Sequence, residues 1–148
     1  MRVQEVMTRN PKYVTPDAPA RDAARIMKEE DVGVVPVVER NDNRRLVGVV
    51  TDRDIALRVV AEGRDGNTPI SQIMSAQRLA TSTPDEDLDD VMDKMASEKV
   101  RRIPVVDDGG SLVGIVSQAD VVRKARNDTK AERTIERISE PGGDHSRT

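Results

Sequence analysis

Two short motifs in the chain combine residue types that could bind a sugar–phosphate ligand. In each, a hydroxyl residue is followed three positions later by an aspartate and preceded three positions earlier by a glycine; the pairs are Thr51 with Asp54 and Ser117 with Asp120. If a helix begins at the hydroxyl, its free backbone amides attract phosphate, and the carboxylate can accept two sugar hydroxyls. The same spacing suits a capping box, in which hydroxyl and carboxylate satisfy those amides themselves. The motifs alone leave both interpretations open.

The composition gives little support to other chemistry. The 148 residues include no Cys and one His, which is His145 near the C-terminal end. Disulfides, thiolate nucleophiles and zinc ribbons are excluded, and an imidazole base or a histidine metal site is disfavoured. The acidic residues Asp85, Glu86, Asp87, Asp89 and Asp90 are typical of a first helical turn, where they complement the helix dipole. We therefore expect no metal site, no required cofactor and no catalytic activity.

Charge and hydropathy argue against two classes of partner. Lys and Arg number 24 and Asp and Glu 27, which gives a net charge of −3, and aromatic residues make up 1% of the chain. Such a chain lacks the cationic surface and the stacking side chains that nucleic-acid binding needs. No apolar run approaches the roughly 18 residues of a membrane span, and the N-terminal residues do not form a signal peptide. We predict a cytoplasmic protein without membrane contact.

Both motifs belong to an internal repeat. Three segments recur in the same order: residues 15–17 as 83–85 and residues 35–38 as 103–106, both 68 positions later, and residues 46–51 as 112–117, 66 positions later. The offset changes by two between the second and third segments. This change predicts a loop of different length in the two copies.

Each repeat predicts a strand, a helix, a hairpin of two strands and a second helix. Thr15 and Thr83 are interpreted as helix N-caps followed by Pro at the first helical position, and Glu86 completes a capping box with Thr83. The positions of Leu88, Val91, Met92 and Met95 on one helical face predict their burial. Runs rich in Val and Ile predict the hairpins, at 34–38 with 46–50 and at 103–106 with 112–116.

The second helices are predicted to begin at Thr51 and Ser117 and to end near Val60 and Arg126. The predicted organisation is a first repeat at 1–66, a second at 67–127, a charged C-terminal helix at 128–140 and a disordered tail at 141–148. About 60 residues bury only a modest core, so neither repeat is expected to be stable alone. The fold class is α/β of the α+β type, with two pseudo-symmetric repeats packed sheet to sheet.

The repeats resemble a tandem pair of CBS (cystathionine β-synthase-type) domains, often called a Bateman module. The resemblance covers roughly residues 3–126 and rests on Val6-Met7-Thr8, residues 14–17, residues 35–37, residues 46–54 and their second-repeat counterparts. It implies a regulatory or sensory module, without catalysis, that binds adenosine-containing ligands such as AMP, ADP, ATP or S-adenosylmethionine in clefts between the repeats. It also implies a homodimer.

The resemblance to CBS domains also implies which residues would bind the ligand. Asp54 and Asp120 would hold ribose hydroxyls, and Thr51 and Ser117 would contact ribose or phosphate from the helix start. The residues that would enclose the adenine or direct the phosphates are Gly33, Val34, Val35 and Pro36 in the first repeat and Arg101, Arg102, Ile103 and Pro104 in the second.

The repeats differ in their arginines. Arg53 stands where the second repeat has Ala119, and Arg101-Arg102 stand where the first repeat has Gly33-Val34. Guanidinium groups suit phosphate oxygens, so these positions are candidates for phosphate contact and for inequivalent clefts. The alternative is that they are solvated or paired with nearby acids such as Glu98 or Asp107.

Two hypotheses of different class remain from the sequence. The first is an adenine-nucleotide sensor whose occupancy is read by an unidentified protein partner. The second is a ligand-free dimeric scaffold or interaction module whose motifs only cap helices. The small residues Ala20, Ala23 and Ala24 suggest that the first helix of repeat one lies in a subunit interface.

Overall fold

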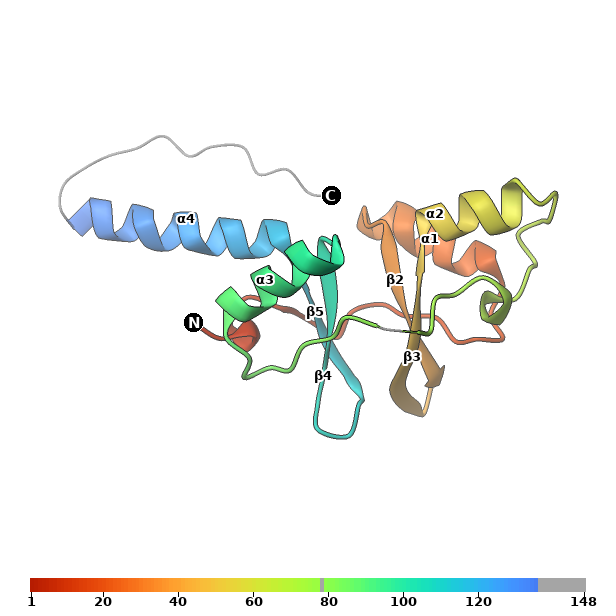
Figure 1. Ribbon diagram of the computed structural model, residues 1–148, viewed down its shortest axis with the longest axis horizontal. Helices are drawn as coiled ribbons and strands as arrows, with labels where there is room; N and C mark the ends of the chain where they lie inside the picture. The colour runs from red at the N-terminus through yellow and green to blue at the C-terminus, as the bar shows by residue number, and fades with distance from the viewer. Residues whose placement is uncertain (78, 136–148) are drawn as a thin grey trace.

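The computed structural model describes residues 1–77 and 79–135. Two similar halves lie side by side, each with a β-hairpin and a pair of helices, and both hairpin tips project away from the helices (Figure 1). The first half comprises α1 (Ala20–Glu30), β2 (Val34–Arg40), β3 (Asn43–Thr51), α2 (Asp52–Ile55) and the π-helix η2 (Ala56–Val60). The second comprises α3 (Leu88–Glu98), β4 (Arg102–Val106), β5 (Leu112–Ser117) and α4 (Gln118–Ile135). Two short elements, η1 (Val3–Glu5) and β1 (Thr8–Arg9), precede the first set, and η3 (Ile70–Gln72) lies between the two sets.

The two predicted hairpins are confirmed, and their registers correspond. Pro36 lies opposite Val49 in the β2–β3 pair, and Pro104 lies opposite Ile115 in the β4–β5 pair. The predicted first strand of each repeat is reduced to one residue, Val14 or Ser82, in a parallel bridge to its hairpin. The hairpins also meet each other, since the Leu46 amide donates to the Gly110 carbonyl oxygen at 3.0 Å. The result is the α+β fold of two pseudo-symmetric repeats that the pattern predicts.

The halves exchange the segments that precede their first helices. Val3 and Met7 are buried in the core of the second half, and β1 extends its sheet in the order β1-β5-β4. In return, Ile70 and Ile73 are buried in the core of the first half. The packing units therefore do not coincide with the sequence segments 1–66 and 67–127. Because each half buries a segment of the other, neither core is complete without both.

Glycine permits this exchange at two equivalent positions. A Cβ at Gly48 would lie 2.8 Å from the Ser75 carbonyl oxygen, and one at Gly114 would lie 3.0 Å from the Thr8 carbonyl oxygen. Real Cβ contacts are longer, so a larger residue would push the crossing segment off the strand. At both glycines the close backbone approach is therefore made by the chain itself.

The predicted starts of the first helices are wrong. Helix α1 begins at Ala20 and α3 at Leu88, in each case five residues after the threonine, Thr15 or Thr83. Each threonine hydroxyl instead donates to the aspartate two residues later, at 2.7 and 2.9 Å, in a turn before the helix. In the second half the cap is Asp87, whose carboxylate accepts from the Asp89 amide at 2.8 Å. The predicted apolar face of α3 is confirmed, since Leu88, Val91 and Met95 are buried and Met92 is partly buried against the same core.

The predicted break after Arg126 is also wrong, because α4 continues through Ile135 as one helix. Residues 127–129 are Asn, Asp and Thr, and none of them stops a helix as Pro or Gly would. The remainder of the predicted C-terminal helix, and the predicted tail at 141–148, lie outside the described residues.

The small residues of α1 have a role within the chain. Ala20 and Ala23 are buried against the first core, where their size lets α1 lie close to the β2–β3 sheet. The argument that they serve a subunit interface therefore does not hold for these two residues. Ala24 is exposed.

Candidate functional site

The first cleft lies where the start of β2 meets the start of β4, and we call it the Thr51 cleft. Its volume is about 750 Å³. The described lining residues are 31–34, 49, 51–52, 75, 77, 79–80, 98–102 and 104. Both halves contribute, together with the segment that joins them. Three of these residues are acidic and three are basic, so the described wall carries no excess charge.

The second cleft, which we call the Asp120 cleft, is smaller, at about 230 Å³. Its described lining residues are 8, 11–12, 26, 30–32, 34, 36, 102, 115, 117, 119–120 and 123. Most occupy positions equivalent to those of the Thr51 cleft: Thr8 corresponds to Ser75, Pro36 to Pro104 and Ser117 to Thr51. The two clefts are therefore related by the internal repeat.

The first hydroxyl–aspartate motif forms a complete capping box. The Thr51 hydroxyl accepts from the Asp54 amide at 3.1 Å, and the Asp54 carboxylate accepts from the Thr51 amide at 2.9 Å. The other carboxylate oxygen lies 3.9 Å from Nε of Arg58, and the Asp54 side chain is 12% exposed. The capping interpretation is thus confirmed for this motif. Thr51 lines the cleft, whereas Asp54 is absent from its lining.

The second motif is arranged differently. The Ser117 hydroxyl accepts from the Asp120 amide at 3.0 Å, as in the first motif. The Asp120 carboxylate accepts instead from the guanidinium of Arg123 at 3.1 Å, and its side chain is 24% exposed. Both Ser117 and Asp120 line their cleft. This carboxylate, held by a neighbouring side chain at a cleft wall, is the better placed of the two to meet a ligand.

The structure brings most of the candidate residues to the clefts. The Thr51 cleft includes Gly33, Val34, Thr51, Arg101, Arg102 and Pro104, and the Asp120 cleft includes Val34, Pro36, Arg102, Ser117 and Asp120. Val35 and Ile103 are fully buried in their cores. Arg53 is exposed on α2 and, like Asp54, lies outside both described linings.

Several cleft residues were missed by sequence reasoning. Thr8, Lys12 and Ser75 belong to the exchanged segments, and Lys99 follows the last turn of α3. One signal could have found two of them, because Val6-Met7-Thr8 is repeated as Ile73-Met74-Ser75. A hydroxyl that recurs after the same apolar pair was a candidate lining residue in both copies.

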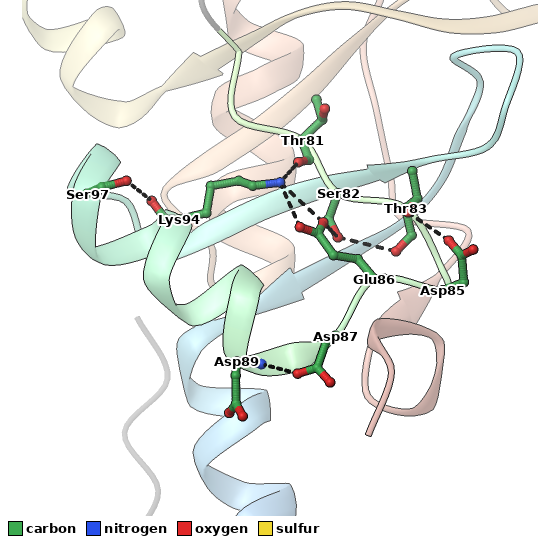
Figure 2. Close-up of polar contacts among 9 residues, drawn as sticks. All are labelled: Thr81, Ser82, Thr83, Asp85, Glu86, Asp87, Asp89, Lys94 and Ser97. Carbon is green, nitrogen blue, oxygen red and sulfur yellow. Dashed lines mark hydrogen bonds and ion pairs between the residues drawn. The ribbon is translucent and has the colours of Figure 1, made fainter.

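A polar network beside α3 distinguishes the second half from the first (Figure 2). The Lys94 ammonium donates to the Thr81 carbonyl oxygen at 2.6 Å and to both carboxylate oxygens of Glu86 at 3.1 and 3.2 Å. The Ser82 hydroxyl donates to the same carboxylate at 2.6 Å. Glu86 therefore binds side chains rather than forming the predicted capping box with Thr83. Lys94 does not reach the Thr51 cleft lining, whereas its counterpart Ile26 lines the Asp120 cleft.

Two repeated α+β halves with two repeat-related clefts between them define a paired-repeat module. The family model described as CBS domain matches residues 3–61 and 70–127. The chain belongs to the CBS domain family and contains a CBS-domain pair.

Proteins of this family are similar to the chain both in sequence and in structure. The chain is 40% identical over 137 residues to the CBS domain-containing protein YhcV of Bacillus subtilis, covering 93% of this chain and 94% of YhcV. The CBS domain protein PAE2072 of Pyrobaculum aerophilum, solved with AMP, has a TM-score of 0.72 at 30% identity, with 81% of this chain and 89% of that chain covered. The CBS-domain pair of protein MJ0100, solved with 5′-methylthioadenosine and S-adenosyl-L-methionine, has a TM-score of 0.74 at 28% identity and covers 86% and 98%.

Two further observations concern the residues 1–77 and 79–135. No helix there has the length and apolar character needed to cross a membrane. Among the same residues, no group of three or more His, Cys, Asp or Glu side chains is arranged to hold a metal ion.

Proposed function

We propose that this CBS-domain pair is a regulatory module that binds an adenosine-containing ligand, AMP, ADP, ATP or S-adenosylmethionine, between its repeats. The observation that carries the proposal is the pair of repeat-related clefts, each with a helix-starting hydroxyl, Thr51 or Ser117, in its wall. Related CBS-domain proteins were solved with AMP and with S-adenosyl-L-methionine and 5′-methylthioadenosine. The ligand would be regulatory, and no catalytic step is assigned to the chain.

The clefts suggest how the parts of the ligand would be held. The Asp120 carboxylate would accept the ribose hydroxyls, while Ser117 and Arg123 would meet the phosphate. Apolar walls that include Val34 and Pro36 would enclose the adenine. In the Thr51 cleft, Arg101 would face the phosphate, and Asp54 would reach a ribose after loosening its bond to the Thr51 amide.

Occupancy would be transmitted to other chains. A ligand that contacts both halves favours one arrangement of the halves, and a protein partner could read that arrangement. We further propose a cytoplasmic homodimer. Its interface would use exposed apolar side chains of the second helices, Leu57, Val60 and Val122, which are 48%, 70% and 39% exposed.

A second candidate is a ligand-free dimeric scaffold. The complete Thr51–Asp54 capping box favours it, because both partners already have a structural role without any ligand. The two candidates differ in a direct observable, since only the first predicts that adenosyl ligands stabilise the native state.

Thermal unfolding against AMP, ADP, ATP, S-adenosylmethionine and 5′-methylthioadenosine tests the proposal. A ligand at about 100 times its dissociation constant should stabilise the native state by about 2.7 kcal/mol and raise the melting temperature by about 8 °C. Asp120→Ala should remove most of the shift from one cleft, measured against its own ligand-free melt. If none of the five ligands shifts the melt of the native chain, the scaffold is the better account.

A further inference from the structure

The first helices of the two repeats end in the same backbone conformation but with opposite charges. Asp31 ends α1 with φ of 54°, Lys99 ends α3 with φ of 56°, and the amide of each donates to the last turn of its helix. Glycine or asparagine is the usual residue in this left-handed conformation. The chain therefore has an anion and a cation at equivalent positions where the backbone conformation itself favours neither.

Asp31 belongs to the walls of both clefts. Residues 31–34 connect the end of α1 to the start of β2, and Asp31, Val32 and Val34 line the Thr51 cleft and the Asp120 cleft alike. Lys99 is in the described lining of the Thr51 cleft alone. The Asp31 carboxylate is thus close to a ligand in either cleft, and Lys99 opposes its charge in only one of them.

No described side chain neutralises the Asp31 carboxylate. The other two acids in the described lining of the Asp120 cleft lie beside cations, Glu30 at 3.6 Å from Lys12 and Asp120 at 3.1 Å from Arg123. Within residues 1–77 and 79–135, the Asp31 side chain makes no hydrogen bond or ion pair. Asp31 therefore contributes a negative charge to the shared wall that these residues leave uncompensated.

We propose that Asp31 is a specificity-determining residue that disfavours phosphorylated adenosyl ligands and favours cationic ones, such as S-adenosylmethionine. The inference rests on the proposed function and adds a charge rule to it. The field of a carboxylate needs no direct contact with the ligand, so it acts on both clefts at once. The bias is strongest in the Asp120 cleft, whose described lining lacks Lys99. Arg102 lines both clefts and has an interaction of its own, so it does not distinguish them.

Coulomb's law gives the size of the effect. Across water, a unit charge about 7 Å from the carboxylate changes an affinity by about 2.5-fold, and the two charges of a phosphate monoester change it by about 6-fold. AMP carries such a monoester, whereas S-adenosylmethionine has a net positive charge from its sulfonium group. The uncharged 5′-methylthioadenosine should not respond to Asp31, so it reports on the shape of the clefts alone.

Isothermal titration calorimetry with AMP, S-adenosylmethionine and 5′-methylthioadenosine tests the proposal on three proteins. These are the native chain, Asp31→Asn and Asp93→Asn, a matched control that removes the same charge from an exposed position of α3 outside both described linings. Asparagine keeps the shape of the Asp31 side chain and tolerates the left-handed backbone. Asp31→Asn should tighten AMP about 6-fold, weaken S-adenosylmethionine about 2.5-fold and leave 5′-methylthioadenosine within about 1.5-fold. Asp93→Asn should leave all three within about 1.5-fold.

Ionic strength provides a readout that a change in cleft shape would not produce. The gain in AMP affinity on Asp31→Asn should be largest at about 20 mM salt and should fall below about 2-fold at about 1 M, where the Debye length is only about 3 Å. A gain that is independent of salt would contradict an effect of charge.

The outcomes separate this inference from the proposed function. If the ligands bind but Asp31→Asn changes no affinity by more than Asp93→Asn does, the charge rule is refuted while ligand binding stands. The rule is also refuted if Asp31→Asn changes all three affinities in the same direction, because that result indicates an altered shape at the helix end. If none of the three ligands binds the native chain, the proposed function fails and the inference fails with it. Circular dichroism and a urea titration verify that both variants are folded.

Discussion

The polar network beside α3 offers a quantitative test of the packing. The first half replaces it with apolar residues at the equivalent positions: Ile26 for Lys94, Ala18 for Glu86 and Val14 for Ser82. All three apolar residues belong to the first core or pack against it. The natural perturbation is therefore to replace residues of the network, singly and then together, by the apolar residues that the first half has at the equivalent positions.

Lys94→Ile should lower the free energy of unfolding by about 2 kcal/mol, because it leaves the Glu86 carboxylate without its cation. The Lys94 and Glu86 side chains are 31% and 22% exposed, so solvent screens the pair only in part. Glu86→Ala should lower the free energy of unfolding by about the same amount. Of the acceptors that Figure 2 shows for the Lys94 ammonium, the Thr81 carbonyl oxygen alone would then remain. The double variant should cost about 2 kcal/mol rather than about 4, because neither charge is left unpaired.

Urea titration followed by circular dichroism measures all three free energies on the ligand-free chain. Lys28→Ile, which replaces an exposed lysine on the equivalent helix α1, serves as the matched control and should change stability by less than about 0.5 kcal/mol. The reasoning is refuted if Lys94→Ile behaves like this control. It is also refuted if the two single effects add within about 0.5 kcal/mol in the double variant.

Three further predictions concern the exchange and the cleft wall. Gly48→Ala should cost about 2 kcal/mol in a urea titration, because the added Cβ would lie 2.8 Å from the Ser75 carbonyl oxygen. Val3→Ala should cost about 2 kcal/mol and speed amide hydrogen exchange in α3 rather than in α1, since Val3 is buried in the second core. Asp31→Asn should stabilise the chain by about 0.5 kcal/mol in the same titration, because Asp31 ends α1 with φ of 54° and an anion there opposes the helix dipole. Unchanged exchange in α3, or a loss of stability in Asp31→Asn, would count against the corresponding argument.

Much of the fold could be predicted because it follows from periodicity. The unbroken β-branched runs around Pro36 and Pro104 favour buried strands, and the spacing of Leu88, Val91 and Met95 favours one buried helical face. The helix starts could not be predicted in the same way. A threonine before proline can cap a helix or donate to an aspartate two residues on, and both options satisfy the local polar groups.

The exchange of segments lay beyond sequence reasoning for a different reason. A repeat shows that Met7 and Met74 are equivalent, but either copy could pack on its own half or on the other with the same local contacts. That choice depends on the path of the whole chain. For the same reason, the sequence predicts only part of each cleft lining. Thr8 and Ser75 reach the clefts only through the exchange of segments. Thr51, Ser117 and Arg102 belong to hairpins that the sequence pattern already predicts.

A crystal structure of the chain grown with AMP tests the central claim most directly. The account predicts AMP in at least one cleft between the halves, with the ribose hydroxyls within hydrogen-bond distance of the Asp120 or Asp54 carboxylate and the phosphate near a helix-starting hydroxyl. AMP bound elsewhere on the surface, or both clefts without AMP at saturating concentration, would contradict it.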